Sequence, residues 1–226
     1  MTEAVSGIVT VLNPVVMSFP TLFEPKKFKG EDGRESGEAK YSASFVFDAD
    51  NPDFNAVKST AIAVAKAKWP GRDIGADFKA GQFNLPFVAG NALIAERKAK
   101  LQKAGKEYDE KADFMAGKFV LKTSSKFAPR LACIENGKIT ADLEGAALAA
   151  NKGKFYFGTK VLIQVNLVAY KGVGKTGVDG VTAYLNIVNT LNEGKRLSGG
   201  QSAAEAFSQY AGKATTENPM DDEIPF

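Results

Sequence analysis

Short runs in which apolar and polar side chains alternate fill most of the first 192 residues, and they predict half-buried β-strands. Residues 40–48 are typical, since Tyr41, Ala43, Phe45 and Phe47 all fall on one side. On this basis strands are expected over residues 4–19, 40–48, 118–125, 130–135, 160–171 and 180–191. The last two are the clearest pair, because the glycine-rich residues 172–179 can join them as a hairpin.

One segment has the period of a helix instead. Asn51 is suited to cap its N-terminus, Pro52 suits its first position, and Pro70-Gly71 ends it. Its apolar side chains recur every three or four residues, at Phe54, Val57, Ala61, Val64, Ala65 and Trp69. Residues 72–116 lack a clear period. Within them, residues 92–105 could form a basic helix, with Arg97, Lys98, Lys100 and Lys103, but this stretch has no wide apolar face. An irregular surface insertion is therefore expected over residues 72–116.

One long helix among five or more strands with glycine turns is typical of a small Greek-key barrel, and the OB (oligonucleotide-binding) barrel is the candidate at this strand count. The sequence thus predicts a mainly β, OB-fold-like domain over residues 1–192. Residues 193–226 are rich in Gly, Ser, Ala, Thr and Asn. Such a composition predicts a flexible, disordered linker that ends in an acidic tail.

Two counts limit the chemistry that is available. The 226-residue chain has no histidine, and Cys133 is its one cysteine. These counts exclude Ser-His-Asp and Cys-His catalysis, as well as zinc sites that need histidine or four cysteines. No intramolecular disulfide can form, which agrees with a reducing compartment, and no apolar run is long enough for a membrane helix. Carboxylate–metal chemistry, lysine chemistry and pure binding remain open after these counts. Among them we expect pure binding, with no cofactor, no metal, no membrane contact and a cytoplasmic location.

The net charge of +3 hides an asymmetry along the chain. Residues 193–226 hold 3 basic and 6 acidic residues, which leaves 26 basic and 20 acidic residues in the first 192. A basic body of net charge +6 with an acidic end indicates a polyanionic ligand and a tail of separate purpose.

The hairpin strands carry a candidate binding surface. Alternation directs Val161, Ile163, Val165, Leu167, Val181, Ala183, Leu185 and Ile187 inward. The outer faces then hold Lys160, Leu162, Gln164, Asn166, Val168, Tyr170, Thr182, Tyr184, Asn186, Val188 and Thr190. Exposed rings among amides and cations are what single-stranded nucleic acids need, because rings stack bases while amides and cations contact backbone and base edges. The alternative is that the two tyrosines only cover a flank of the barrel.

A second basic row lies on the strand at residues 118–125. Lys118, Lys122 and Lys126 are four residues apart, so they share one side and stand roughly 13 Å from one another. Phe127 and Arg130 follow directly. The spacing lets each lysine reach a different phosphate of an extended strand, although an ordinary solvated face would look the same.

Two motif-like stretches do not match the motifs that they resemble. A P-loop ending in Lys175-Thr176 would need its first glycine at position 169, where the sequence has Ala169. The acidic run at residues 48–53 has Asp53 at the glycine position of a calcium loop and Ser59 at its final glutamate position. The first stretch is better explained as a loop in which Lys171 or Lys175 can contact phosphate. The second is better explained as a strand-to-helix turn.

The chain ends in Met220-Asp221-Asp222-Glu223-Ile224-Pro225-Phe226. An apolar end behind three carboxylates suits capture in a basic-rimmed apolar pocket of a partner protein, and a merely solubilising end is the alternative. This ending closely resembles the C-terminal tip of bacterial single-stranded-DNA-binding proteins. The resemblance implies that Asp221, Asp222, Glu223, Ile224, Pro225 and Phe226 recruit replication and repair enzymes and compete with DNA for the basic groove.

The body of the chain resembles a different family. Residues 15–192 are similar to phage single-stranded-DNA-binding proteins with an OB fold. The similarity is carried by Pro20-Thr21-Leu22-Phe23, Tyr41-Ser42-Ala43-Ser44-Phe45, the helix at 51–69, and residues 158–170 with 181–191. It implies a phage protein in the host cytoplasm, with homo-oligomers such as a dimer by analogy.

Together these features predict a non-enzymatic, sequence-tolerant single-stranded-DNA-binding protein of phage replication, recombination and repair. The residues expected to contact DNA are Lys118, Lys122, Lys126, Phe127, Arg130, Lys160, Gln164, Asn166, Tyr170, Lys171 and Tyr184. One rival is a metal-dependent nuclease or recombination enzyme that uses Asp48, Asp50 and Asp53. A virion or scaffold protein is another.

Overall fold

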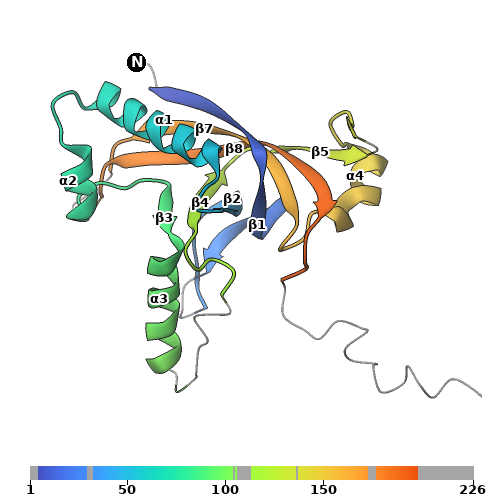
Figure 1. The fold of residues 1–226 in the computed structure, drawn as a ribbon, viewed down its shortest axis with the longest axis horizontal. Coiled ribbons are helices and arrows are strands. Elements are labelled where there is room, and N and C mark those ends of the chain that lie inside the picture. The colour runs from blue at the N-terminus through green and yellow to red at the C-terminus, as the bar shows by residue number, and fades with distance from the viewer. Residues whose placement is uncertain are drawn as a thin grey trace, which may run out of the picture. The chain divides into compact units, whose positions relative to one another are not determined.

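Eight strands in one sheet dominate the computed structural model, which describes residues 5–29, 33–103, 105, 113–135, 137–172 and 177–197. The strands are β1 (Ser6–Lys29), β2 (Glu35–Phe47), β3 (Phe87–Ala89), β4 (Phe119–Ser125), β5 (Arg130–Glu135), β6 (Lys138–Ile139), β7 (Lys160–Tyr170) and β8 (Gly180–Glu193). Their order is β3-β4-β2-β1-β7-β8-β5-β6 (Figure 1). Among the described strands, β5 and β8 pair in parallel and the other neighbours pair antiparallel.

Chain connectivity joins the two ends of this sheet. Strands β4 and β5 are consecutive in the chain, with residues 126–129 between them. Even so, β4 pairs with β2, whereas β5 pairs with β8. Strand β4 also lies close to β8. The sheet therefore curls round on itself, which is the plan of a partly open Greek-key barrel. The predicted mainly β, OB-like fold is confirmed.

The long helix is confirmed as α1 (Pro52–Lys68). The side chain of Asn51 accepts a hydrogen bond from the backbone N–H of Asp53 at 3.0 Å, which caps the helix at its N-terminus. Its buried residues are those that the period predicted, except that Trp69 lies just beyond the last turn and is half-buried. The helix packs on β1, β7 and β8.

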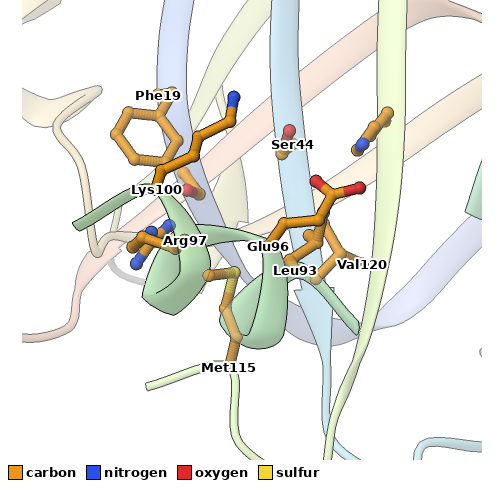
Figure 2. A pocket seen from close by; sticks show the side chains of 10 residues that line it. Phe19, Ser44, Leu93, Glu96, Arg97, Lys100, Met115 and Val120 are labelled. Atoms are coloured by element: carbon orange, nitrogen blue, oxygen red, sulfur yellow. The ribbon is translucent and has the colours of Figure 1, made fainter. Parts of the chain in front are cut away.

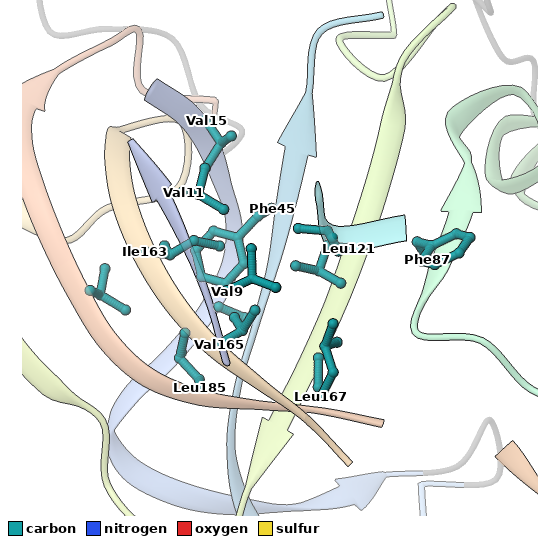
Figure 3. Close-up of a cluster of buried hydrophobic side chains, with 14 of the residues drawn as sticks. Val9, Val11, Val15, Phe45, Phe87, Leu121, Ile163, Val165, Leu167 and Leu185 are labelled. Atoms are coloured by element: carbon teal, nitrogen blue, oxygen red, sulfur yellow. The ribbon is translucent and has the colours of Figure 1, made fainter. Parts of the chain in front are cut away.

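The core is the inner face of the curled sheet. Figure 3 shows Val9, Phe45, Leu121, Val165 and Leu185 directed toward one another from five strands. Inward alternation along β7 is confirmed, since its four predicted core residues are at most 2% exposed. Burial of such side chains stabilises the fold by about 1.5–3 kcal/mol for each large aliphatic or aromatic residue.

Alternation along β8 breaks at a β-bulge. Val165 pairs with Leu185, whereas Gln164 pairs with Ile187, so Asn186 is an extra residue on β8. An extra residue reverses the face of every later side chain. The predictions beyond this point were therefore wrong: Val188 and Thr190 are buried, and Ile187 is only partly buried.

The expectation of an irregular insertion over residues 72–116 was also wrong. This stretch contains α2 (Ile74–Lys79), β3 and α3 (Gly90–Lys103), and Ile74, Phe83 and Phe87 belong to the main core. Elements of three and six residues are too short to show a period. The possible basic helix over residues 92–105 is present as α3, which begins at Gly90 and ends at Lys103; among its described residues it buries only Gly90 and Ile94, so its sequence has almost no apolar stripe.

The remaining helical elements are α4 (Gly145–Asn151) and the 3₁₀ turn η1 (Lys152–Lys154), both between β6 and β7. Within the described part of the chain, no helix is long and apolar enough to span a membrane. The expected linker and tail begin at residue 193, and their residues 198–226 lie outside the described residues.

Candidate nucleic-acid interface

Three neighbouring hollows all take lining residues from β2 and β4, and they share some of these residues. The first, of about 440 Å³, lies between β4 and β8 and is here called the tyrosine pocket, because Tyr170 and Tyr184 line it. The second, of about 290 Å³, is the α3 pocket, lined by residues of β1, β2, β4 and α3. The third, of about 490 Å³, is the hairpin pocket, beside the β1–β2 connection.

Shared residues make these hollows one continuous surface. Lys122 lines both the tyrosine pocket and the α3 pocket. Lys40 and Ser124 line both the tyrosine pocket and the hairpin pocket. We call the whole surface the β2–β4 groove, since strands β2 and β4 form its floor. In OB folds the corresponding strands and their flanking loops bind oligonucleotides.

The hairpin pocket concentrates positive charge at a cost to stability. Four lysines line it, namely Lys26, Lys27, Lys29 and Lys40, with Glu38 as its one acidic lining residue. In the β1–β2 register Lys26 lies directly opposite Lys40. Like charges directly opposite each other destabilise a strand pair, so the arrangement indicates a role other than folding.

The tyrosine pocket holds its two rings differently. Tyr184 is 41% exposed, on the outer face of β8. The hydroxyl of Tyr170 accepts a hydrogen bond from Asn84 Nδ2 at 3.2 Å, which fixes that ring at the rim. A Cβ on Gly180, the register partner of Tyr170, would lie 2.8 Å from that hydroxyl and 2.6 Å from the Asn84 carbonyl oxygen. Only glycine allows this close approach.

Arg72 ties the wall of the tyrosine pocket to the β7–β8 connection. Its guanidinium donates to Asp179 Oδ2 at 2.9 Å, to the carbonyl of Gln82 at 2.8 Å, and to Asp77. It also lies over the Phe83 ring, 5.1 Å from the ring centre. Segment 72–86 is thereby held against the start of β8, where the backbone N–H of Val181 donates to the Asn84 carbonyl at 2.9 Å.

Of the residues predicted to bind DNA, the groove collects Tyr170, Tyr184 and Lys122. Lys171 is exposed beside Tyr170 in the sequence. Lys126 forms an ion pair with Glu38, a lining residue of the hairpin pocket. The hydrogen bond from Lys126 holds the pKa of the Glu38 carboxyl below its usual value.

The predicted row of three lysines is interrupted. Val120 lies between Lys118 and Lys122 on their side of β4, and it is buried with Ile94 of α3. Lys118 forms an ion pair with Asp48 at 2.7 Å. Helix α3, which the sequence does not show as a packed element, thus separates Lys118 from the groove.

The other predicted residues lie away from the three hollows. Arg130 pairs with Asp142 at 3.6 Å, and Gln164 donates to Thr10 Oγ1 at 3.2 Å. The side-chain oxygen of Asn166 is buried without a hydrogen-bond partner in the described structure. Phe127 is 83% exposed, and Lys160 is also exposed. The acidic tip and Lys175 lie outside the described residues.

Sequence reasoning missed the β1 side of the groove. Strand β1 continues to Lys29, ten residues beyond its predicted end at Phe19, and these extra residues carry Lys26, Lys27 and Lys29. The basic run at residues 26–29 was the available signal. The strand was not recognised in the sequence because bulges interrupt its alternation: its pairing with β2 shifts register three times.

Two of the three carboxylates of the rival nuclease hypothesis, Asp48 and Asp53, have structural partners. Asp53 Oδ2 accepts hydrogen bonds from the backbone N–H groups of Leu12 and Asn13, both at 2.7 Å, and Asp48 pairs with Lys118. Among the described residues, no group of three or more histidine, cysteine, aspartate or glutamate side chains could hold a metal ion.

Comparisons with known proteins assign the chain to a family. The model described as "Enterobacter phage Enc34, ssDNA-binding protein" matches residues 8–219. The chain is 28% identical over 190 residues to protein p50 of Acyrthosiphon pisum secondary endosymbiont phage 1, covering 84% of this chain and 86% of p50.

Solved structures share the fold. The single-stranded-DNA-binding protein of bacteriophage Enc34 in complex with ssDNA matches with a TM-score of 0.53 and 16% identity, over 86% of this chain and 90% of that one. A C-terminal truncation of the Enc34 protein matches with a TM-score of 0.53 and 16% identity, over 85% and 88% of the chains. Because the family model spans nearly the whole sequence, this chain belongs to the Enc34 family of phage single-stranded-DNA-binding proteins.

Proposed function

We propose that this protein binds single-stranded DNA along the β2–β4 groove, with no catalytic step. The observation that carries the proposal is the juxtaposition of Lys26 and Lys40 on facing strands, beside the tyrosine pocket, which Lys40 also lines together with Tyr170 and Tyr184. A polyanion removes the repulsion between the facing lysines, and bases supply the partners for the rings.

Each part of the groove has a distinct task in this proposal. Lysines of the hairpin pocket and Lys122 contact phosphates, which contribute affinity and carry no sequence information. The exposed ring of Tyr184 stacks on a base, and every base offers a face for stacking. Binding of this kind suits a protein that coats exposed strands during phage replication, recombination and repair in the host cytoplasm.

Affinity for oligo-dT is expected to fall steeply as salt rises. Each phosphate that a lysine neutralises contributes about −0.7 to the slope of log K against log salt on single strands. Five lysines line the hairpin and tyrosine pockets, namely Lys26, Lys27, Lys29, Lys40 and Lys122. Fluorescence anisotropy with labelled dT₁₂ from about 50 to 200 mM salt measures the slope. A slope near zero would contradict the proposed groove.

The acidic tip is proposed to recruit replication and repair proteins and to compete with DNA. Deleting residues 220–226 is expected to raise affinity for oligo-dT, because three carboxylates that can occupy the basic groove are removed. Phe226→Ala is expected to leave DNA affinity unchanged and to abolish capture of partner proteins, since it removes only the apolar anchor.

Pull-down of host replication proteins, alongside titration with oligo-dT, separates these two roles of the tip. Unchanged DNA affinity after the deletion would contradict the competition. Unchanged pull-down by Phe226→Ala would contradict the apolar anchor. A homodimer is proposed by analogy alone, and the mass of the protein in solution tests it.

A further inference from the structure

The α3 pocket differs in chemistry from the rest of the groove. Its lining includes apolar side chains from α3 and β4, the ring of Phe19, two serines, two lysines, one glutamate and Arg97, which pairs with Asp113. Figure 2 shows the Glu96 carboxylate extending from α3 toward Ser44, and Lys100 extending beside Phe19. At about 290 Å³ the pocket is close to the lower end of the size range of small-ligand sites. It is suited to a single small group, not to a length of backbone.

A buried hydroxyl in this pocket lacks a partner. Ser18 lines the pocket and is 1% exposed, and its Oγ has no hydrogen-bond partner among the described residues. Buried polar side chains are nearly always hydrogen-bonded, and an exception requires an explanation. A ligand that offers a hydrogen-bonding atom would provide one.

The next residue has an unusual backbone conformation. Phe19 has a φ of +48°, in the left-handed region that bulky residues rarely adopt, and it lies where the β1–β2 register shifts between Ser18 and Thr21. Bulges and strained residues are over-represented at binding sites, because they redirect side chains. Here the result is a ring that is 59% exposed at the pocket.

Other rings support Phe19 from one side. Its ring centre lies 4.8 Å from that of Phe157, which in turn lies 5.4 Å from that of Phe114. A ring held by a neighbour loses little further freedom when a base stacks on it. Phe19 therefore has the features of a stacking platform.

Glu96 is an acidic residue in a basic groove. Its carboxylate repels phosphate and can only accept hydrogen bonds. It therefore favours binding of a nucleotide only when the base offers N–H donors to it. Among the bases, guanine places two adjacent donors, N1–H and the N2 amino group, where one carboxylate can accept both. Its O6 can accept from a hydroxyl such as that of Ser18. Thymine presents a single donor between two carbonyl oxygens, which a carboxylate repels.

We propose that the α3 pocket is a subsite for one unstacked nucleotide, in which Phe19 stacks on the base and Glu96 accepts from its N–H donors, with guanine preferred. The proposal rests on the proposed binding of single-stranded DNA and adds a base preference at one position of an otherwise sequence-tolerant groove. Lys100 and Lys122, which line the same pocket, contact the flanking phosphates.

Three labelled 12-mers test the subsite: dT₁₂, the same strand with one central dG, and the same strand with one central deoxyinosine. Deoxyinosine differs from dG only in lacking the N2 amino group. The wild-type protein is expected to bind the dG strand about 5-fold or more tighter than the deoxyinosine strand, the lower limit for a lost bidentate contact. Binding is measured by anisotropy at one fixed salt concentration.

Glu96→Ala is expected to bring the ratio of the dG and deoxyinosine affinities to one. Glu96 is exposed on α3, so the variant folds. The matched control is Glu144→Ala, which removes the same charge from an exposed residue whose side chain makes no capping hydrogen bond at α4, and it keeps the ratio.

Ser18→Ala is a second test of the same subsite, because it removes the hydroxyl that lacks a partner. This variant is expected to reduce the ratio of the dG-strand affinity to the dT₁₂ affinity. Equal affinity of the wild-type protein for dG and deoxyinosine strands, or an unchanged ratio in Glu96→Ala, would overturn the subsite and leave the groove standing. Failure of the wild-type protein to bind dT₁₂ would instead overturn the proposed function itself.

Discussion

Tyr184→Ala is expected to weaken binding of oligo-dT by about 5- to 150-fold, which corresponds to the 1–3 kcal/mol that one base–aromatic stack contributes. The ring is 41% exposed on the outer face of β8 and lines the tyrosine pocket. At this point of β8 the core is formed by the neighbouring residues Ala183 and Leu185 and not by Tyr184, so the variant is expected to fold. Anisotropy with labelled dT₁₂ measures the loss, and thermal unfolding checks the fold.

Two variants show whether stacking is the cause. Tyr184→Phe keeps the ring and is expected to bind as the wild type does. Tyr170→Phe removes the hydroxyl that accepts from Asn84 and tests whether fixing that ring matters. Native stability together with unchanged dT₁₂ binding in Tyr184→Ala would mean that the ring only covers a flank of the barrel.

The elements that the sequence predicted well are those with a long, unbroken period. Helix α1 shows its cap, its buried face and its stop within 20 residues, from Asn51 to Pro70. Strand β7 alternates from Lys160 to Val168, and β5 has the predicted bounds. In each case local propensity and burial point to the same answer, so tertiary contacts had nothing to override.

The features that the sequence did not reveal depend on contacts between distant segments. The bulge at Asn186 exists only in relation to β7, and it reverses the predicted faces of Val188 and Thr190. Segment 72–86 becomes a pocket wall because Arg72 meets Asp179, 107 residues away. Neither pairing leaves a periodic signal in one strand or one helix.

The sequence predicted the type of site, an aromatic and basic surface, but only some of the residues that line it. Aromatic and basic side chains on the strands that became β7 and β8 led to Tyr170 and Tyr184, both of which lie in one pocket with Lys122. The lysines of the hairpin pocket escaped notice, because the bulges of β1 break the alternation that would have placed them on a strand. Bulges are frequent beside binding sites, so the pattern failed where the candidate site lies.

Reversing two charges in the groove is expected to have the largest effect of all. Lys40 and Lys122 each line two of the three hollows, so Lys40→Glu/Lys122→Glu alters every part of the groove. At 50 mM salt one phosphate contact on a single strand contributes about 8-fold in affinity relative to 1 M salt. Two lost contacts and two new repulsions are expected to weaken dT₁₂ binding about 1,000-fold. The slope of log K against log salt is expected to fall by at least ~1.4, from the two lost contacts.

The matched control changes the net charge equally at a different place. Lys58→Glu/Lys66→Glu puts the same two substitutions on exposed positions of α1, which packs on β1, β7 and β8 and contributes no residue to the groove. If binding depended only on the net charge of the protein, both double variants would lose affinity alike. The groove predicts a loss about 10-fold or more larger for Lys40→Glu/Lys122→Glu, because short-range phosphate contacts are screened far less than charges beyond a Debye length of about 10 Å. Equal losses in the two variants would place the DNA elsewhere on the protein.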